Sequence, residues 1–193
     1  MVKNDMTDYE KKEARTAFSQ NEWMSEYMDR LKEAEEINNA PEEPLKYAFG
    51  IDVGGTAVKL GLLRTDGTII EKWEIPTEKA DSGAHILPDI AAQIENKIRE
   101  YDLSKSDILG AGLGVPGPVI EGGIVNKCVN LGWGVFNVEE ELGRLTGLKV
   151  KAGNDANVAA LGEMGLGGGK GSRNGVLVTL GTGVGGGIII KGK

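Results

Sequence analysis

The chain has 193 residues, of which 40% are hydrophobic, and this is enough to bury a substantial core. Its net charge of −7 and its isoelectric point near 4.9 argue against a surface that binds nucleic acid or an anionic membrane. The 30 glycines cluster between apolar runs, so they predict many tight turns rather than disorder.

Cysteine content and hydropathy predict the compartment. The single cysteine, Cys128, cannot form an internal disulfide, which favours a reducing environment. No apolar run approaches the roughly 18 residues of a membrane span, and the N-terminus lacks the layout of a signal peptide. We therefore expect a cytoplasmic protein. With Cys128 and the single histidine, His85, a structural zinc site within this chain is not expected.

Residues 1–46 form a separate acidic segment that ends in a proline-containing linker. Apolar residues recur at a spacing of three to four, which predicts one or two amphipathic helices, at Trp23, Tyr27, Leu31 and Ala34. We expect this extension to dock on the domain or on a partner subunit. A DNA-reading helix pair is disfavoured because phosphate contacts need Lys and Arg.

The rest of the chain is organised around residues 47–63, where an apolar run is interrupted by Asp52 and by Gly54, Gly55 and Thr56. The glycines permit a tight turn, so this pattern predicts a β-hairpin. Backbone N–H groups at such a tip can bind a phosphate, and Asp52 at the strand end can hold a hydrated Mg²⁺ ion. An ordinary glycine hairpin with a solvated aspartate is the alternative.

A strand over residues 68–75 and a helix follow this hairpin. The helix is indicated by one apolar face that runs from Ile86 to Ile98. His85 precedes it and is interpreted as a surface or capping residue.

A buried strand over residues 108–115 comes next and contains Gly112-x-Gly114-x-x-Gly117. This is the spacing of a dinucleotide-binding loop. That loop requires a helix directly after the strand, whereas a Pro-Gly-Pro turn follows here, so the match is spurious.

Residues 129–134 form a second loop. Asn130 offers both a donor and an acceptor, and Trp133 offers an apolar wall, a combination that suits a sugar. A plain turn is the alternative.

A helix from Asn137 to Gly147 and a short strand over residues 148–152 then lead to Asn154 and Asp155, where another helix begins. Two interpretations of this pair stay open. It either caps the helix and complements the helix dipole, or Asp155 is a general base while Asn154 orients a substrate.

The last part repeats the pattern of the first hairpin. Residues 167–171 fail as a P-loop, because Met164 and Gly171 stand where that motif needs Gly and Ser or Thr. A strand over 175–180, a glycine turn over 181–187 and an apolar run over 188–190 then form a second glycine hairpin. Two such hairpins with a candidate base between them predict two lobes that present phosphate-binding turns to one cleft.

In order and spacing, five motifs across about residues 47–193 resemble the ROK family of sugar kinases and related repressors, whose bacterial glucokinases share the fold of actin and hexokinase. The motifs are Asp52-Val53-Gly54-Gly55-Thr56-x-x-Lys59, Gly114-Val115-Pro116-Gly117, Asn130-Leu131-Gly132-Trp133, Asn154-Asp155-Ala156-Asn157 and Leu180-Gly181-Thr182-Gly183-Val184-Gly185-Gly186-Gly187. The resemblance implies an α/β fold: an actin-like, hexokinase-like (ribonuclease H-like) ATPase lobe over 47–172. It also implies the start of a second lobe over 173–193, after the helical extension over 1–46.

The resemblance implies ATP-dependent phosphorylation of a hexose, in first place of glucose to glucose 6-phosphate. Asp155 would accept the proton of the sugar 6-hydroxyl as that oxygen attacks the γ-phosphate. The sugar would be bound by Asn130, Asn154, Asp155, Pro116 and Gly117. The ATP phosphates would be bound by Gly54, Gly55, Thr56, Lys59, Thr182 and Gly183. Asp52 would bind Mg²⁺ through water.

The family's kinases continue beyond the point that matches Lys193, with a Gly-Glu-x-Gly-His segment, a cysteine-rich zinc loop and an adenosine pocket. Zinc is therefore expected only in that later part, and a homodimer is expected for the full-length protein. We expect the 193-residue chain, as a truncated kinase, to show little or no kinase activity. Exposed strand edges over residues 176–190 should make it prone to association.

Other functions remain open. A kinase for fructose, mannose or an N-acetylated amino sugar is the nearest alternative. A sugar-sensing repressor is disfavoured by the acidic N-terminal segment, and a non-catalytic sugar- or nucleotide-binding protein is a further possibility. The residues do not decide between ATP and polyphosphate as phosphoryl donor.

Overall fold

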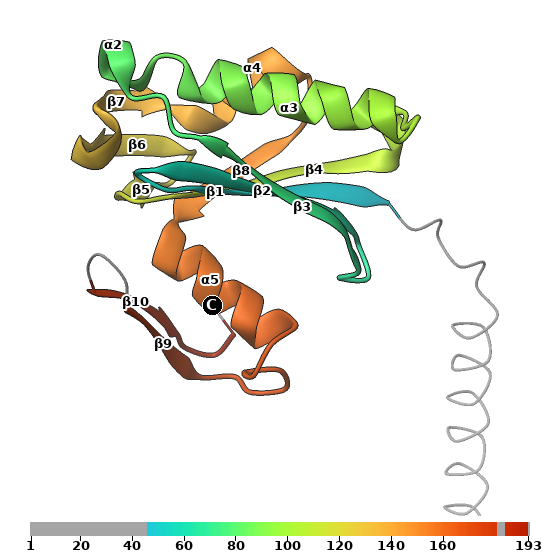
Figure 1. Cartoon of the computed structure of the whole chain (residues 1–193). Helices are drawn as coiled ribbons and strands as arrows, with labels where there is room; N and C mark the ends of the chain where they lie inside the picture. The colour runs from blue at the N-terminus through green and yellow to red at the C-terminus, as the bar shows by residue number, and fades with distance from the viewer. Residues whose placement is uncertain (1–45, 181–183, 193) are drawn as a thin grey trace, which may run out of the picture. The chain divides into compact units, whose positions relative to one another are not determined.

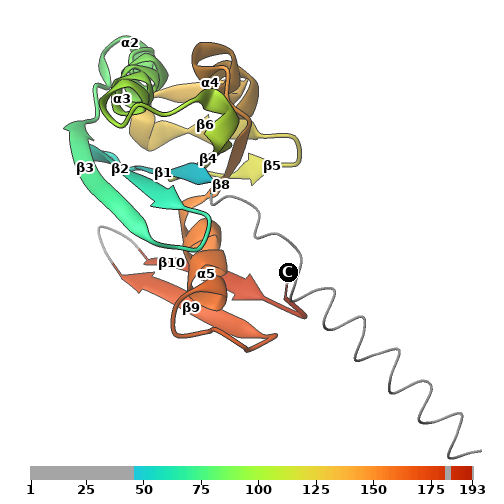
Figure 2. The ribbon, with the colours of Figure 1, turned by 90° about the vertical axis from the view of Figure 1, so that its right-hand side faces the viewer.

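The computed structural model describes residues 46–180 and 184–192, and these residues build a mixed five-stranded sheet with helices on both sides (Figures 1 and 2). The helices expected within residues 1–45 and the tip of the second hairpin, residues 181–183, lie outside the described residues. In spatial order the strands are β3 (Ile69–Pro76), β2 (Ala57–Arg64), β1 (Tyr47–Val53), β4 (Ile108–Val115) and β8 (Val150–Asn154).

The first three strands are antiparallel neighbours, whereas β1, β4 and β8 run parallel. The predicted hairpin of β1 and β2 is confirmed, and an Asp66 side chain that accepts from the Thr68 N–H at 2.8 Å shapes the turn into β3. Parallel strands end at the same edge of a sheet. The register therefore places Asp52 beside Gly114, and Val115 beside Asn154.

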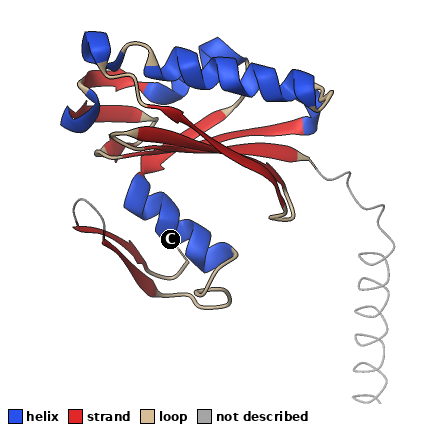
Figure 3. Ribbon diagram, viewed as in Figure 1, coloured by secondary structure: helices blue, strands red, loops and turns tan. Residues whose placement is uncertain are grey.

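Two helices, α3 (Ile86–Glu100) and α4 (Val138–Thr146), cover one face of the sheet (Figure 3). The apolar face predicted for α3 is confirmed, since all of its members are buried: Ile86, Leu87, Ile90, Ala91, Ile94 and Ile98. They form one core with the inward side chains of β1, which include Phe49 and Ile51. His85 precedes α3, but its side chain is exposed and makes no capping hydrogen bond.

Shorter elements fill the connections. The turn α2 (Ala80–Gly83) precedes α3, and the 3₁₀ turn η1 (Lys105–Asp107) precedes β4. A small antiparallel sheet follows β4 and is interrupted by the turn η2 (Val129–Leu131). Its strands are β5 (Val119–Ile120), β6 (Ile124–Cys128) and β7 (Trp133–Asn137).

The caps predicted for α4 are confirmed. The Asn137 side chain accepts from the Glu140 N–H at 3.1 Å, and Gly147 ends the helix with a left-handed φ of 70°. The strand after α4 begins at Val150, two residues later than expected. The reason is that Leu148 still belongs to the helix end, where its N–H donates to the Thr146 hydroxyl.

On the other side of the sheet lie α5 (Asp155–Gly165) and the hairpin of β9 (Gly175–Leu180) and β10 (Val184–Ile189). The glycines of β10 allow the strand to lie directly on the small residues of α5. A Cβ atom at Gly187 would stand 2.7 Å from the Ala156 carbonyl oxygen, and one at Gly185 would stand 3.2 Å from the Ala156 Cβ. Within the described ranges, no helix combines the length and the apolar character that a membrane span requires.

Candidate active site

An open cleft of about 1170 Å³ lies at the edge of the sheet where β1, β4 and β8 end. It brings together ten of the residues predicted from the sequence: Asp52, Gly54, Gly55, Thr56, Lys59, Pro116, Gly117, Asn130, Asn154 and Asp155. Thr182 and Gly183 lie outside the described residues. Thr179, Leu180, Gly185 and Gly186 of the second hairpin do line the cleft, so both glycine hairpins reach it.

The turn of the first hairpin, residues 54–56, forms one wall of the cleft. The Gly54 N–H donates to the Ala57 carbonyl at 3.0 Å, and a Cβ atom at Gly54 would stand 2.7 Å from that oxygen. Gly54 therefore closes the turn and does not offer its own N–H. The N–H groups of Gly55 and Thr56 have no partner among the described residues. Two adjacent free donors of this kind suit a phosphate oxygen.

The Pro116-Gly117 turn after β4 also lines the cleft and is bound by two side chains. The Cys128 thiol donates to the Pro116 carbonyl at 3.3 Å, and the Asn154 side-chain N–H donates to the Gly117 carbonyl at 3.3 Å. Burial raises the pKa of the Cys128 thiol, so the thiol keeps the proton that it donates. A Cβ atom at Gly117 would stand 3.2 Å from the Cys128 Cβ, so the two loops are closely packed.

Asn154 and Asp155 both accept hydrogen bonds from N–H groups at the start of α5. The Asn154 side-chain oxygen caps α5 by accepting from the Asn157 N–H at 3.4 Å. With its amide nitrogen bound to Gly117, Asn154 keeps one N–H for a ligand. Asp155 is exposed at the first position of α5 and lines the cleft, with one carboxylate oxygen bound to the Ala156 N–H at 2.8 Å. The other oxygen is the candidate proton acceptor.

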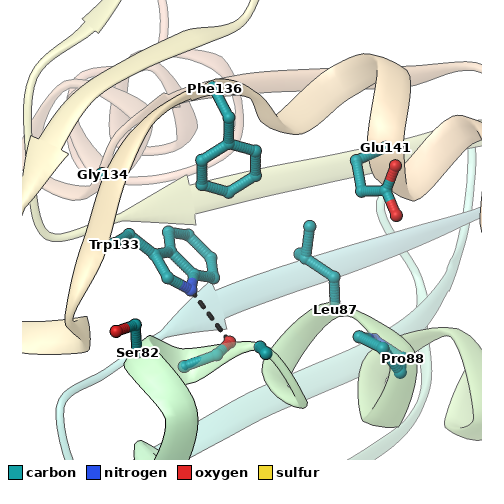
Figure 4. Close-up of a pocket in the computed structure, with 9 residues that line it drawn as sticks. Ser82, Leu87, Pro88, Trp133, Gly134, Phe136 and Glu141 are labelled. Carbon is teal, nitrogen blue, oxygen red and sulfur yellow. Dashed lines mark hydrogen bonds between the residues drawn. The ribbon is translucent and has the colours of Figure 1, made fainter.

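Trp133 does not line the cleft, in contrast to the apolar wall expected from the sequence. Its indole is 5% exposed, donates to the Gly83 carbonyl at 3.1 Å and contacts the Phe136 ring edge-on (Figure 4). It lines a separate pocket of about 220 Å³ together with Leu87 and Pro88. Asn130 lines the cleft. The loop that contains Asn130 is anchored to α2 by the hydrogen bond of Trp133.

The backbone of α2, which accepts the hydrogen bond from the Trp133 indole, is strained. Asp81, Ser82 and Gly83 follow one another with φ values of 50°, 58° and 70°. Only glycine fits at position 83, because a Cβ atom there would stand 2.8 Å from the Trp133 Nε1. Consecutive left-handed residues persist only where their surroundings hold them. Here the hydrogen bond from Trp133 to Gly83 fixes the Asn130 loop and α2 against each other.

Two residues near the cleft carry no sequence signal. Lys79 is exposed and lines the cleft together with Thr56 and Lys59. Thr77 is buried, and its hydroxyl donates to the Gly54 carbonyl at 2.7 Å. A lone threonine or lysine after a strand belongs to no periodic pattern or motif, so only the fold could bring these residues to the turn of the first hairpin.

The cleft offers hard oxygen ligands for a Mg²⁺ ion. Asp52 is an exposed carboxylate at the end of β1 and lines the cleft with Asp155. This fits an ion that keeps most of its waters and takes one or two carboxylates. Across residues 46–180 and 184–192, no three His, Cys, Asp or Glu side chains form a metal cluster.

Comparison with known proteins relates this chain to one family. A sequence model of the ROK family matches residues 48–193. A glucokinase from Halalkalibacterium halodurans is 47% identical over 149 residues, which are 77% of this chain and 45% of that protein.

Solved structures agree with this match. A ROK family glucokinase from Streptomyces griseus, in complex with glucose and AMPPNP, superposes with a TM-score of 0.66 at 32% identity over 76% of this chain and 45% of that one. An inorganic polyphosphate/ATP-glucomannokinase from Arthrobacter sp. superposes with a TM-score of 0.64 at 27% identity over 77% of this chain and 60% of that one. The expected hexokinase-like α/β fold is thereby confirmed. The chain spans less than half the length of the glucokinases that it matches.

Proposed function

This chain belongs to the ROK family, and on that premise we propose that the protein phosphorylates a hexose, in first place glucose, with ATP as the donor. One observation carries the proposal. Asp155, of which one carboxylate oxygen has no partner among the described residues, lines a cleft that is also lined by Asn130 and by Gly55 and Thr56 with their unpartnered amides. This grouping supports a proton acceptor, a phosphate cradle and a sugar-binding loop in one cleft.

Phosphoryl transfer requires the protein mainly to position the reactants and to neutralise the phosphate charge. The sugar 6-oxygen forms a bond to the γ-phosphorus, its proton passes to Asp155, and the bond between the γ-phosphorus and the bridging oxygen breaks to release ADP. A positioned base contributes about 10²- to 10⁴-fold to such a step. Asn130 and the remaining N–H of Asn154 orient ring hydroxyls, and the amides of Gly55 and Thr56 with Lys59 receive phosphate oxygens. When bound at Asp52, Mg²⁺ supplies neutralisation of phosphate charge.

Binding is the first test, because it does not depend on turnover. We expect saturable glucose binding by isothermal titration calorimetry, weakened about tenfold by Asn130→Ala through loss of a hydrogen-bonding partner for a sugar hydroxyl. Lys72→Ala, on the exposed side of β3, is the control. If no hexose binds, the proposal is wrong.

Turnover tests the role of Asp155. Glucose and Mg·ATP are incubated with the chain and with Asp155→Asn, and glucose 6-phosphate is measured by a coupled dehydrogenase assay. We expect any phosphorylation to be lost in Asp155→Asn while glucose binding stays within a few-fold, since the amide keeps the shape but not the basicity. Equal rates for the two proteins would exclude Asp155 as the base.

An alternative donor has a specific observation in its favour. The Arthrobacter relative is described as using inorganic polyphosphate as well as ATP, and it superposes on the same region. The described part of the cleft offers a backbone turn and lysines to a phosphate, and these groups would not distinguish ATP from polyphosphate. The same assay with polyphosphate in place of ATP decides between the donors.

A further inference from the structure

We propose that Thr77 is the positioning residue that holds the phosphate turn of the first hairpin in its anion-binding form. The inference rests on the proposed function, since it assigns Thr77 a task in phosphate binding. Thr77 directly follows β3, lies outside all the motifs of the sequence and is 9% exposed.

Thr77 binds the turn at two points. Its hydroxyl donates to the Gly54 carbonyl at 2.7 Å, and its N–H donates to the Thr56 carbonyl at 3.0 Å. The turn's own hydrogen bond runs from the Gly54 N–H to the Ala57 carbonyl. Thr77 therefore binds both flanking carbonyl groups, while the N–H groups of Gly55 and Thr56 have no partner among the described residues.

The orientation of the carbonyl groups decides whether such a turn can bind an anion. A carbonyl oxygen that points at a phosphate repels it, whereas an N–H group attracts it. A Gly-Gly-Thr tip has wide conformational freedom, because its glycines populate both signs of φ. The hydrogen bonds from Thr77 restrict this freedom, because they engage the Gly54 and Thr56 carbonyl oxygens and leave the N–H groups of Gly55 and Thr56 without a partner among the described residues. Hence the hydroxyl of Thr77 acts on the ligand through the backbone and does not need to touch it.

A matched control exists in the same chain. Thr146 is also a buried threonine whose hydroxyl donates to a backbone carbonyl, that of Leu142 at 2.8 Å. It lies at the end of α4 and is not among the residues that line the cleft. Replacement of either threonine by valine keeps the shape and removes one hydroxyl. A general loss of stability should affect both variants, whereas a positioning role affects only Thr77→Val.

The experiment measures the dissociation constant of Mg·AMPPNP by titration calorimetry for the wild-type chain, Thr77→Val, Thr77→Ser and Thr146→Val. We expect about tenfold weaker binding for Thr77→Val, in line with the loss of a hydrogen bond that orients donors to a charged group. Thr77→Ser should stay within twofold because it restores the hydroxyl, and Thr146→Val should bind like the wild type. Unchanged binding by Thr77→Val, or equal weakening by Thr146→Val, would overturn the inference.

A second readout separates this inference from the proposed function. Backbone ¹⁵N order parameters of residues 54–56 are measured in the ligand-free chain. We expect them to fall in Thr77→Val and to stay high in Thr77→Ser and Thr146→Val. If the wild-type chain does not bind Mg·AMPPNP, the proposed function loses its support, while the order parameters still decide whether Thr77 holds the turn. Order parameters that are unchanged in Thr77→Val refute the positioning role.

Discussion

Charge in the cleft is carried by a few exposed side chains. Lys59 and Lys79 line the cleft, and so do the carboxylates Asp52 and Asp155. Lys59 was expected from its place in the first motif, whereas Lys79 reaches the cleft only because β3 returns to the end of β1. The two lysines thus bring positive charge to the cleft that Gly55 and Thr56 also line.

Lys79 is predicted to strengthen the binding of a triphosphate. Lys79→Ala should weaken Mg·AMPPNP binding by about fivefold at low salt, the upper range for an exposed charge pair. The effect should shrink as salt is raised, because an exposed charge is screened. Lys72→Ala, which removes the same charge from an exposed position of β3 outside the cleft, is the control. An equal loss in both variants would show that only net charge matters.

At the scale of elements, β3 and α3 are joined by one polar cluster. Lys97 of α3 contacts Glu71 of β3 at 2.7 Å and Glu100 at 2.8 Å, and its ammonium lies 5.1 Å from the centre of the Trp73 ring. The Tyr101 hydroxyl donates to Glu71 at 3.0 Å. The cluster connects β3, the strand that precedes Thr77, to the main helix of the core.

This cluster predicts a pH dependence of stability. The hydrogen bond from Lys97 holds the pKa of Glu71 below its usual value of 4.5, and the bond from Tyr101 acts in the same direction. Because the pKa of Glu71 is lower in the folded state, its contribution is present above pH 4.5 and is lost as pH falls through the folded pKa. In thermal unfolding between about pH 7 and pH 3, Glu71→Gln should lose less stability than the wild type on acidification.

The control for this prediction is Glu121→Gln, which changes an exposed glutamate in the turn between β5 and β6. Its loss of thermal stability on acidification should equal that of the wild type. If the wild type and Glu71→Gln lose the same stability on acidification, a role of the Lys97 contact in acid stability is excluded.

For the whole molecule, most elements could be predicted because they depend on local patterns. The apolar period of α3, the caps of α4 and the glycine turn after β1 are encoded within a few neighbouring residues. Less of the candidate site could be predicted from the sequence. Asp155, Asn130 and the phosphate turn form motifs, but Thr77, Lys79 and the buried position of Trp133 depend on strand order and on contacts between distant segments.

The outer face of the β9–β10 hairpin carries a large exposed apolar surface. Its side chains alternate with those that face α5, and the exposed fractions are 71% for Val176, 58% for Val178, 82% for Leu180 and 65% for Ile188. Contiguous apolar area of this kind favours association. It agrees with the tendency expected from the sequence for residues 176–190, which stays a prediction.

Self-association should therefore depend on this face. Val178→Lys is expected to shift the chain toward the monomer in sedimentation velocity experiments at several concentrations, because a charge in the middle of the face opposes its burial. The matched control is Val135→Lys on β7, a valine that is exposed to 68% elsewhere. Identical sedimentation of the wild type and Val178→Lys would place the association surface, if any, outside this hairpin.

The hydrogen bond from Thr77 to Gly54 also bears on the order of folding events. The two residues are 23 positions apart, and β3 lies between them and must pair with β2 before the bond can form. A contact of this sequence separation closes later than the hairpin of β1 and β2 itself. The phosphate turn should therefore pass through a stage in which its strands are paired but its tip is still mobile. In refolding kinetics, Thr77→Val should then accelerate unfolding much more than it slows folding.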